Sequence, residues 1–331
     1  MLNRVRLLGG ASLALAAQTI TRRWLANADS SRAADSSSSR SPPPPPAAPV
    51  WYSACGVAPD ALKLVAGRHA DCAAWGFHSD TINATGWAQL SIESNAALDD
   101  GAQTFAAGWL EAAISAERIY QSKLTTFFLV FTNSVPPPKM INFITQNLVW
   151  MRDQMRANNV SSWPLEGVFD EAIDAAAQRE WPQSPQPPRD APSDPFAYWS
   201  AVSALFSQLK GMWMGYRAFG AAGEPLAWLD LYLLQAGSDC EDLLPALGLQ
   251  ASLSAHSVVE HCSALVKLTP DFQEIFVSHV TWSGYTSMLR QWKRYRLPLS
   301  FAAAVDMQFS SYPGVRRSCN FSCFCACVHI D

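Results

Sequence analysis

The 331-residue sequence has no surplus of basic residues and no long hydrophobic run. Lys and Arg number 24 against 28 Asp and Glu, a net charge of −4, which argues against a surface built for nucleic acid. The longest β-like apolar run, Leu124 to Phe131, is much shorter than the roughly 20 residues that a membrane-spanning helix needs. It predicts a buried strand instead. We therefore expect neither a nucleic-acid partner nor a transmembrane span.

The sequence also lacks the paired cysteine clusters that are typical of a zinc site. Structural zinc sites take pairs of ligands from two places in the chain. Here four cysteines crowd into residues 315–331 with no second cluster except His329, so we interpret this stretch as an aberrant Cys-rich tail and expect no metal and no cofactor. The four are Cys319, Cys323, Cys325 and Cys327.

A targeting segment opens the chain. Arg4 and Arg6 form a basic start, and residues 7–17 form an apolar core with small residues at its end. This order predicts a signal peptide over residues 1–17. The alternative is an organelle transit peptide, because Arg22 and Arg23 follow soon after.

Residues 18–50 read as a disordered linker. They contain a serine run and five consecutive prolines, Pro42 to Pro46, and such a stretch buries too little apolar surface to offset its ordering entropy. Folding should begin near Trp51, in a chain that is 49% hydrophobic and long enough for a sizeable core.

Residues 51–261 predict short strands followed by helices. Strands are expected between Leu62 and Glu93, where residues 88–93 alternate like a half-buried strand. Asp99 or Asp100, and later Asp194 before Pro195, are typical helix starts. Three apolar stripes at helical spacing and a segment from Pro225 to Leu247 predict further core helices, and Glu166 to Arg179 a short one. The stripes are Phe105, Trp109, Ala112, Ala116 and Ile119; Met140, Ile144, Leu148, Met151 and Met155; and Trp199, Val202, Phe206, Leu209, Trp213 and Tyr216.

Two glycosylation sequons, at Asn83 and Asn159, would be usable if the chain is secreted.

The chemically suggestive stretch runs from His261 to Trp282. Two β-type runs flank the turn signal Thr269-Pro270-Asp271, which predicts a hairpin. Pairing Leu268 with about Glu274 would place Cys262 opposite about Val280, and so beside His279 and Trp282. A thiol at a strand start with a histidine returned to it is typical of a nucleophile site. The non-catalytic alternatives are that Cys262 is a buried structural cysteine and that His279 is a structural histidine.

After this hairpin, a helix is expected from Ser283. We expect its apolar side chains to face inward and its basic ones outward, where they would meet solvent or anionic lipid. The inward set is Tyr285, Met288, Leu289 and Trp292, and the outward set is Arg290, Lys293 and Arg294.

Several long strings resemble the phospholipase B-like family of lysosomal or secreted N-terminal-nucleophile hydrolases. The resemblance runs with gaps from about Thr81 to Gly314. It rests on TINATGWAQLSIESN, FAAGWLEAAISAERIYQ, SQLKGMWMGY, HCSALVKLTP, SHVTWSGYTSMLR and FSSYPG, all in the family's order.

The resemblance implies an α+β fold, an αββα sandwich that is incomplete here. It also implies self-cleavage between His261 and Cys262, with residues 248–261 as a pro-segment and residues 262–314 as the start of the nucleophile-bearing part. Cys262 would then be the catalytic nucleophile, with His279 and Trp282 as site residues. The implied substrate is a phospholipid or other acyl lipid, met at a membrane surface, in a secreted or lysosomal location.

The chain departs from the family pattern after FSSYPG. The family's Asn and Arg that complete the oxyanion site are not matched, and residues 315–331 resemble nothing in the family. The alternative to an acyl hydrolase is therefore an inactive truncated member or a non-enzymatic binding fragment.

Overall fold

The computed structural model describes residues 48–56, 61–160, 163–168, 194–252, 254, 263–280, 285, 288–302, 305–315 and 328–329. The chain divides into two units, residues 1–48 and 49–331, and the described helices and strands all lie in the second. The expected signal peptide and most of the expected linker lie outside the described residues, as do His261, Cys262, Trp282 and the tail cysteines.

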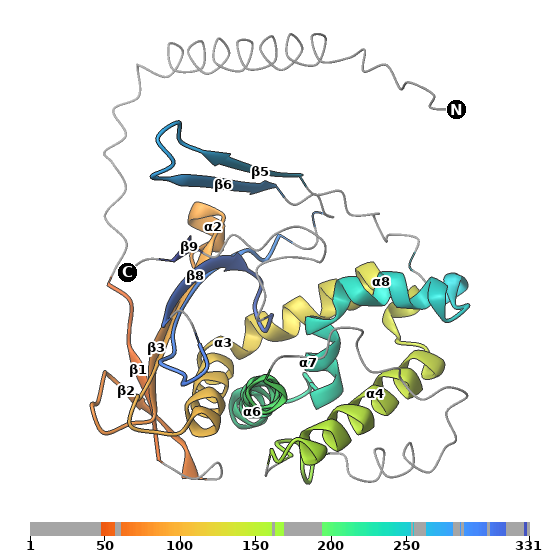
Figure 1. Ribbon diagram of the computed structural model, residues 1–331, viewed down its shortest axis with the longest axis horizontal. Helices are drawn as coiled ribbons and strands as arrows, with labels where there is room; N and C mark the ends of the chain where they lie inside the picture. Colours follow the sequence, from red (N-terminus) through yellow and green to blue (C-terminus); the bar gives the residue numbers. More distant parts are fainter. Residues whose placement is uncertain are drawn as a thin grey trace. The chain divides into compact units, whose positions relative to one another are not determined.

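A seven-stranded mixed sheet forms one side of the second unit (Figure 1). Its strand order is β2-β1-β3-β4-β7-β8-β9, and every neighbouring pair is antiparallel except β4 and β7, which are parallel. The strands are β1 (Tyr52–Cys55), β2 (Lys63–Ala66), β3 (Ala74–Ser79), β4 (Ala88–Ser94), β7 (Gln291–Arg296), β8 (Asp306–Ser311) and the two-residue β9 (Val328–His329).

A layer of helices accompanies the sheet (Figure 1). Two of the helix starts were predicted from sequence, and both are confirmed. The Asp99 carboxylate accepts a hydrogen bond from Ala102 N at 2.9 Å, and Asp194 accepts one from Ala197 N at 3.0 Å. The helices are α2 (Ile82–Thr85), α3 (Asp100–Val130), α4 (Pro138–Ala157), α6 (Pro195–Phe219), α7 (Trp228–Gln235) and α8 (Gly237–Ala246), with short 3₁₀ turns η2 (Thr132–Ser134) and η3 (Gln250–Ser252).

Three glycines let α3 and α6 pack backbone against backbone. A Cβ added at Gly108 would lie 2.0 Å from the Gln208 carbonyl oxygen, and one at Gly211 would lie 2.0 Å from that of Phe105. At Gly215 the corresponding distance, to the Trp109 carbonyl oxygen, is 2.3 Å. These distances are far below contact, so the string GMWMG fixes how closely the two helices approach.

The hydrophobic core has a sheet part and a helical part. In the sheet part, Phe105, Trp109 and Leu110 of α3 pack on Leu90 and Ile92 of β4. The helical part joins the C-terminal end of α3 to α4, α6, α7 and α8. It contains the predicted methionine stripe and most of the aromatic stripe, as core rather than ligands. Its buried members include Met140, Leu148, Met155, Trp199, Phe206 and Leu209.

The predicted hairpin is confirmed, with a register that differs from the expected one by a single residue. Strand β5 (Ser263–Leu268) pairs antiparallel with β6 (Ile275–Val280). Leu268 lies opposite Ile275, and Ser263 opposite Val280. The two strands form a separate two-stranded sheet.

The predicted strand at Leu124 to Phe131 is wrong, because α3 continues through Val130. Phe127, Val130 and Phe131 are buried, while Leu124 and Phe128 are exposed. The apolar residues therefore contact the helical core on one side only, with helical spacing. Their β-type composition is overridden by packing.

The predicted helix after Ser283 is also wrong over its second half. Residues 291–296 form β7, and Tyr285 is 92% exposed. The expected facing is inverted: Lys293 is fully buried and Trp292 is 41% exposed. In a strand successive side chains alternate between faces, so the helical stripe does not exist here.

One smaller prediction also needs correction. Strand β4 was expected to be half-buried, but Ser91 and Glu93 are buried as well as Leu90 and Ile92. The segment from Pro225 to Leu247, predicted to be helical, forms the two helices α7 and α8, which meet at Ala236. The predicted helix from Glu166 to Arg179 lies almost entirely outside the described residues.

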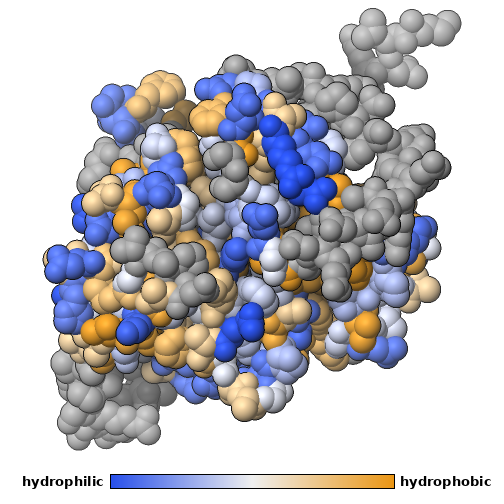
Figure 2. Space-filling model, turned by 90° about the horizontal axis from the view of Figure 1, so that it is seen from below, coloured by the Kyte–Doolittle hydropathy of each residue, from blue (hydrophilic) through white to orange (hydrophobic). Residues whose placement is uncertain are grey.

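The observed architecture is thus α+β, as predicted. Among the described helices none is long and apolar enough to cross a membrane. In the view of Figure 2, hydrophobic and hydrophilic residues are interspersed over the surface.

Candidate active site

Strand β5 begins at the residue that follows Cys262. The hairpin then returns the chain so that His279 of β6 lies opposite Ala264 of β5. Cys262, His261 and Trp282 themselves lie outside the described residues, as does the side chain of His279. The structure therefore brings the backbone of His279 level with the start of the strand that Cys262 precedes.

The turn of the hairpin is held by its own side chains. Thr269 N donates to the Glu274 carbonyl at 3.0 Å, and Glu274 N donates to Thr269 Oγ1 at 3.0 Å. Phe272 closes the turn with a φ of +58°. Hydrogen bonds from Thr269 and then from the Gln273 backbone lower the pKa of Asp271. Because these contacts join residues close together in the chain, the hairpin could be predicted from the sequence.

The hairpin exposes apolar side chains. Leu265 is 62% exposed and Phe276 58%, and Val266, Leu268 and Phe272 are exposed too. Two isolated strands are marginally stable in water, and soluble proteins rarely expose so many neighbouring apolar residues without a partner. The hairpin therefore has the composition of a buried element.

A buried charged cluster links β7 to α3. Lys293 Nζ lies 2.7 Å from Glu111 Oε1, and Tyr295 OH donates to Glu111 Oε2 at 2.5 Å. Lys293 Nζ also donates to the Val315 carbonyl at 2.6 Å. Both Lys293 and Glu111 are fully buried, so the pair links the sheet, the helix and the turn that follows β8. The sequence did not predict this cluster, because the helix expected over residues 291–296 would have placed Lys293 at the surface.

His78 and Gln291 add buried polar atoms to the described part of the sheet. Burial lowers the pKa of His78; the charges of Arg118 and Lys293 act in the same direction and those of Asp80 and Glu111 oppose it. His78 Nε2 and both amide atoms of Gln291 have no hydrogen-bond partner among the described residues. Each such group costs stability.

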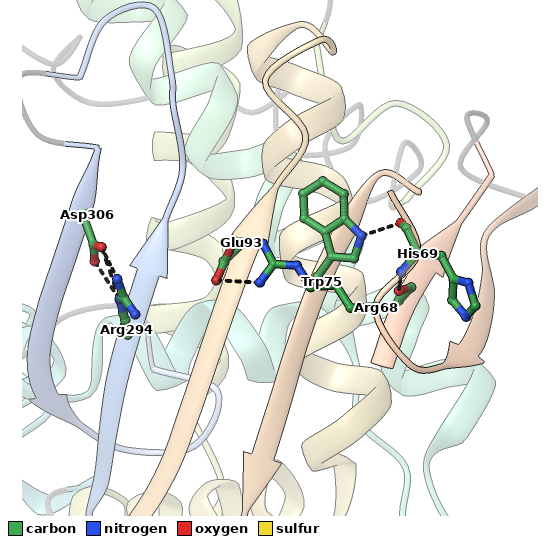
Figure 3. A network of polar contacts seen from close by, with 7 residues as sticks. Arg68, His69, Trp75, Glu93, Arg294 and Asp306 are labelled. Carbon is green, nitrogen blue, oxygen red and sulfur yellow. Dashed lines mark hydrogen bonds and ion pairs between the residues drawn. The ribbon is translucent and has the colours of Figure 1, made fainter. Parts of the chain in front are cut away.

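Ion pairs occupy the face of the sheet opposite α3 (Figure 3). Arg68 Nη2 lies 2.5 Å from Glu93 Oε2. The Arg68 guanidinium carbon lies 5.1 Å from the centroid of the Trp51 ring and 5.4 Å from that of the Trp75 ring. On the neighbouring strands, Arg294 Nε donates to Asp306 at 2.9 Å. The first pair joins the loop after β2 to β4, and the second joins β7 to β8. The arginine side chains are 49% and 43% exposed, and pairs that solvent reaches contribute about 0–1 kcal/mol each.

The described cysteines differ sharply from a reactive nucleophile. Cys55 and Cys72 form a disulfide. Cys240 is fully buried, and burial, followed by the charges of Asp239 and Glu241, raises the pKa of its thiol to about 12. Such a thiol stays protonated and inert. No group of His, Cys, Asp and Glu within the described segments has the arrangement to hold a metal ion.

The two sequons differ in context. Asn83 is exposed on the short helix α2. Asn159 is also exposed, directly after α4, with a φ of +61°; Ser161 of its sequon lies outside the described residues.

Comparison with known proteins gives a consistent result. Residues 74–321 match the Phospholipase B family. The chain is 32% identical over 275 residues to "Putative phospholipase B-like 2" of Mus musculus, covering 76% of this chain and 39% of that protein. It is 27% identical over 268 residues to "Phospholipase B-like protein D" of Dictyostelium discoideum, covering 76% of this chain and 41% of that protein. The chain thus spans about two fifths of the length of these relatives.

Proposed function

Because the chain belongs to the phospholipase B-like family, we propose that it carries the nucleophile-bearing part of an acyl hydrolase whose nucleophile is Cys262. The family also assigns the α+β architecture to the N-terminal-nucleophile hydrolases. The proposed substrate is the acyl ester, or amide, of a phospholipid or related lipid.

The single observation that supports this proposal is the placement of the hairpin. Strand β5 starts immediately after Cys262, and β6 brings His279 opposite Ala264. Residues two apart on a strand share a face, so an extended Cys262 would share the face of Ala264 and His279. A histidine so placed can exchange a proton with a nucleophile or orient the substrate.

The proposed maturation is an intramolecular cleavage. The Cys262 thiol attacks the carbonyl carbon of His261, the C–N bond between the two residues breaks, and a thioester forms while the α-amine of Cys262 is released. Water then hydrolyses the thioester to free the thiol and leave a carboxylate on His261. One residue would afterwards carry both a thiol and an amine.

The freed amine would assist the thiol in acyl transfer. An unperturbed α-amine titrates at about 7.7–8.0, so in an acidic lumen it would be charged and would favour the thiolate beside it. The thiolate would attack the lipid carbonyl and release the alcohol, and water would hydrolyse the resulting acyl-enzyme. His279 would orient the substrate or share a proton, and Trp282 would form a wall of the pocket.

We further propose that the chain enters the secretory pathway. The basic and apolar start of the sequence supports this, as do the Cys55–Cys72 disulfide and the exposed sequon residue Asn83, because disulfides persist in oxidising compartments. Endoglycosidase treatment of the expressed protein should lower its mass. Import into mitochondria with no glycan at Asn83 or Asn159 would contradict the proposal.

Cleavage and turnover test the nucleophile assignment together. N-terminal sequencing of the new fragment should read Cys-Ser-Ala-Leu, and hydrolysis of an acyl ester should depend on Cys262. Cys262→Ala should abolish both. Cys240→Ala is the matched control, because it removes a buried, inert thiol and should leave cleavage intact. Cleavage that persists in Cys262→Ala would refute the assignment.

A second candidate is that the 331-residue chain is a family member without turnover. The exposure of Leu265, Val266 and Phe276 favours this alternative, because a hairpin whose apolar side chains face solvent does not hold a nucleophile in fixed geometry. A monodisperse 331-residue protein with Cys262-dependent turnover would exclude this candidate.

A further inference from the structure

A pocket of about 430 Å³ lies at the C-terminal end of α6. Its first wall is the end of the helix, where Trp213, Tyr216 and Arg217 are three and four residues apart and so share one face. Its second wall comes from the loop that connects α6 to α7, residues 220–227. The volume falls within the range of about 300–1,000 Å³ that is usual for small-molecule sites. This end of the helix therefore has room for a small ligand.

The loop wall is held in place by hydrogen bonds to two helices. Tyr216 OH of α6 donates to the Glu224 carbonyl at 2.9 Å, and Lys123 Nζ of α3 donates to the Pro225 carbonyl at 3.2 Å. Lys123 is itself held by an ion pair with α7, in which its Nζ lies 3.0 Å from Asp230 Oδ2. The pocket is thus formed before a ligand arrives, which lowers the entropy cost of binding.

One positive and one negative residue line the pocket, Arg217 and Glu224. The Arg217 guanidinium carbon lies 4.8 Å from the centroid of the Trp213 ring, so the ring positions the planar group. Neither charged group forms an ion pair, with the other or with any further residue that the structure describes. Burial, followed by the Glu224 charge, raises the pKa of Tyr216 to about 12, so its hydroxyl keeps the proton that it donates to the loop. A guanidinium and a carboxylate are therefore both open to a ligand.

These two charges favour a zwitterion. A carboxylate or phosphate suits the planar guanidinium of Arg217 through paired hydrogen bonds, and an ammonium group suits the carboxylate of Glu224. A ligand with a single charge would satisfy one of the two groups and be repelled by the other. The rest of the lining is mainly apolar and includes Trp213, Pro225 and Leu226, so it suits an apolar body.

We propose that this pocket binds a small zwitterion with an apolar body, its anionic group at Arg217 and its ammonium group at Glu224. Cys262 takes no part in this site, so the proposal is independent of the proposed hydrolase activity. A free apolar amino acid and the head group of a phosphocholine lipid share this chemistry, and the anion, carboxylate or phosphate, distinguishes them.

Calorimetric titration of the 331-residue chain at about pH 6, where an α-amine is protonated, tests the requirement for both charges. Phenylalanine carries both, N-acetylphenylalanine carries the carboxylate alone, and phenylalanine amide carries the ammonium alone. Phenylalanine should bind at least about tenfold more tightly than either single-charge probe, because each of these leaves one charge of the pocket unmatched.

Glycerophosphocholine, with glycerophosphate and choline as its single-charge controls, distinguishes the two sources of the ligand. Binding of phenylalanine alone would identify a free amino acid, binding of glycerophosphocholine alone would identify a phosphate-bearing head group, and binding of both would admit both sources. Binding of neither zwitterion would overturn the proposal, and so would a zwitterion that binds no more tightly than its single-charge controls.

Substitutions assign each charge of the ligand to one side chain. Arg217→Gln should weaken the binding of the zwitterion and of the anionic probe by about tenfold and leave the cationic probe no weaker, whereas Glu224→Gln should weaken the zwitterion and the cationic probe and leave the anionic probe no weaker. Arg156→Gln is the matched control, because Arg156 is also an exposed arginine in the last turn of a helix, α4; it should leave the binding of every probe unchanged.

Filling the pocket locates the ligand. Ala221→Trp places a large side chain in the lining and should abolish binding, whereas Ala222→Trp places the same side chain at the next exposed position and should leave binding unchanged. Unfolding midpoints of the variants separate loss of the site from loss of the fold. Unchanged binding in folded Ala221→Trp and Arg217→Gln variants would show that the ligand lies elsewhere.

Discussion

The seven-stranded sheet buries a lysine, whereas the two-stranded hairpin exposes leucine, valine and phenylalanine. Lys293 of β7 is fully buried because Glu111 of α3 and the Val315 carbonyl meet its ammonium group. Leu265 and Phe276 of the hairpin are more than half exposed, and among the described strands β5 and β6 pair only with each other. Polarity alone would predict the reverse. The difference shows that burial follows from the partner that an element finds.

The two regions also differ in whether contacts distant or local in sequence stabilise them. The sheet and the helices packed on it depend on contacts between segments far apart in sequence, such as Glu111 of α3 with Lys293 of β7, and Gly211 of α6 with Phe105 of α3. The hairpin depends on contacts within Thr269 to Glu274. Changes in the sheet should therefore alter global unfolding, and changes in the hairpin should alter association.

The largest effect is expected when the same residue type is truncated in both sheets. Lys293→Ala should lower the free energy of unfolding by about 3–5 kcal/mol, because it leaves the Glu111 carboxylate buried and uncompensated. Lys267→Ala removes an exposed lysine of β5 and should change the free energy of unfolding by less than about 0.5 kcal/mol. Urea denaturation measures both. Similar losses in the two variants would erase the distinction between the sheets. The double variant Glu111→Gln/Lys293→Met should recover part of the loss.

A smaller loss is expected at the helix contact behind the seven-stranded sheet. Gly211→Ala forces a Cβ to within 2.0 Å of the Phe105 carbonyl oxygen and should destabilise the protein by about 1–3 kcal/mol through overpacking. In the control, Gly101→Ala, the Cβ lies 3.2 Å from Asp99 Oδ1 and 3.9 Å from Ser207 Oγ, with no backbone atom in closer contact, and the effect should stay within about 1 kcal/mol. Thermal unfolding compares the two. A neutral Gly211→Ala would mean that α3 and α6 are not held at this distance.

The pH dependence of unfolding tests the sheet in a third way. Burial lowers the pKa of His78 below its value of about 6.5 in the unfolded chain, so the unfolded state binds more protons as the pH falls through that region. Stability should therefore decrease between pH 7.5 and pH 5.5. His78→Gln should flatten this decrease. An unchanged slope in His78→Gln would contradict the burial of a neutral imidazole.

The smallest effect on unfolding is expected in the hairpin. Leu265→Thr/Phe276→Ser replaces exposed apolar side chains and should change the free energy of unfolding by less than about 0.5 kcal/mol. The same variant should reduce association in light scattering, because it removes exposed apolar side chains from a two-stranded sheet. Leu90→Ala in the sheet should instead cost about 2–5 kcal/mol. A hairpin variant as destabilised as Leu90→Ala would show that the hairpin is packed in solution.

The hairpin was the part of the candidate site that the sequence could predict. Thr269, Pro270 and Asp271 act within a few residues of one another, so the turn was recognisable, and the register followed to within one residue. Which side chains meet Cys262 depends on contacts outside this local network. For that reason the roles of His279 and Trp282 remain proposals that rest on the family.

The sequence by itself determined the features that are decided locally. Asp99 and Asp194 start α3 and α6 because their carboxylates reach a backbone amide three residues on. The long strings shared with the phospholipase B-like family likewise sufficed to identify it, as the match over residues 74–321 bears out.

Only the tertiary structure decided whether residues 124–131 and 291–296 became helix or strand. Both segments carry apolar residues that satisfy either period, so local preference did not separate the two outcomes. Residues 124–131 continue α3 because the helical core receives Phe127 and Val130. Residues 291–296 form β7 because the edge of β4 pairs with them and Glu111 neutralises Lys293. The partner that removes a side chain from water lies far away in the sequence, and only the folded chain brings it near.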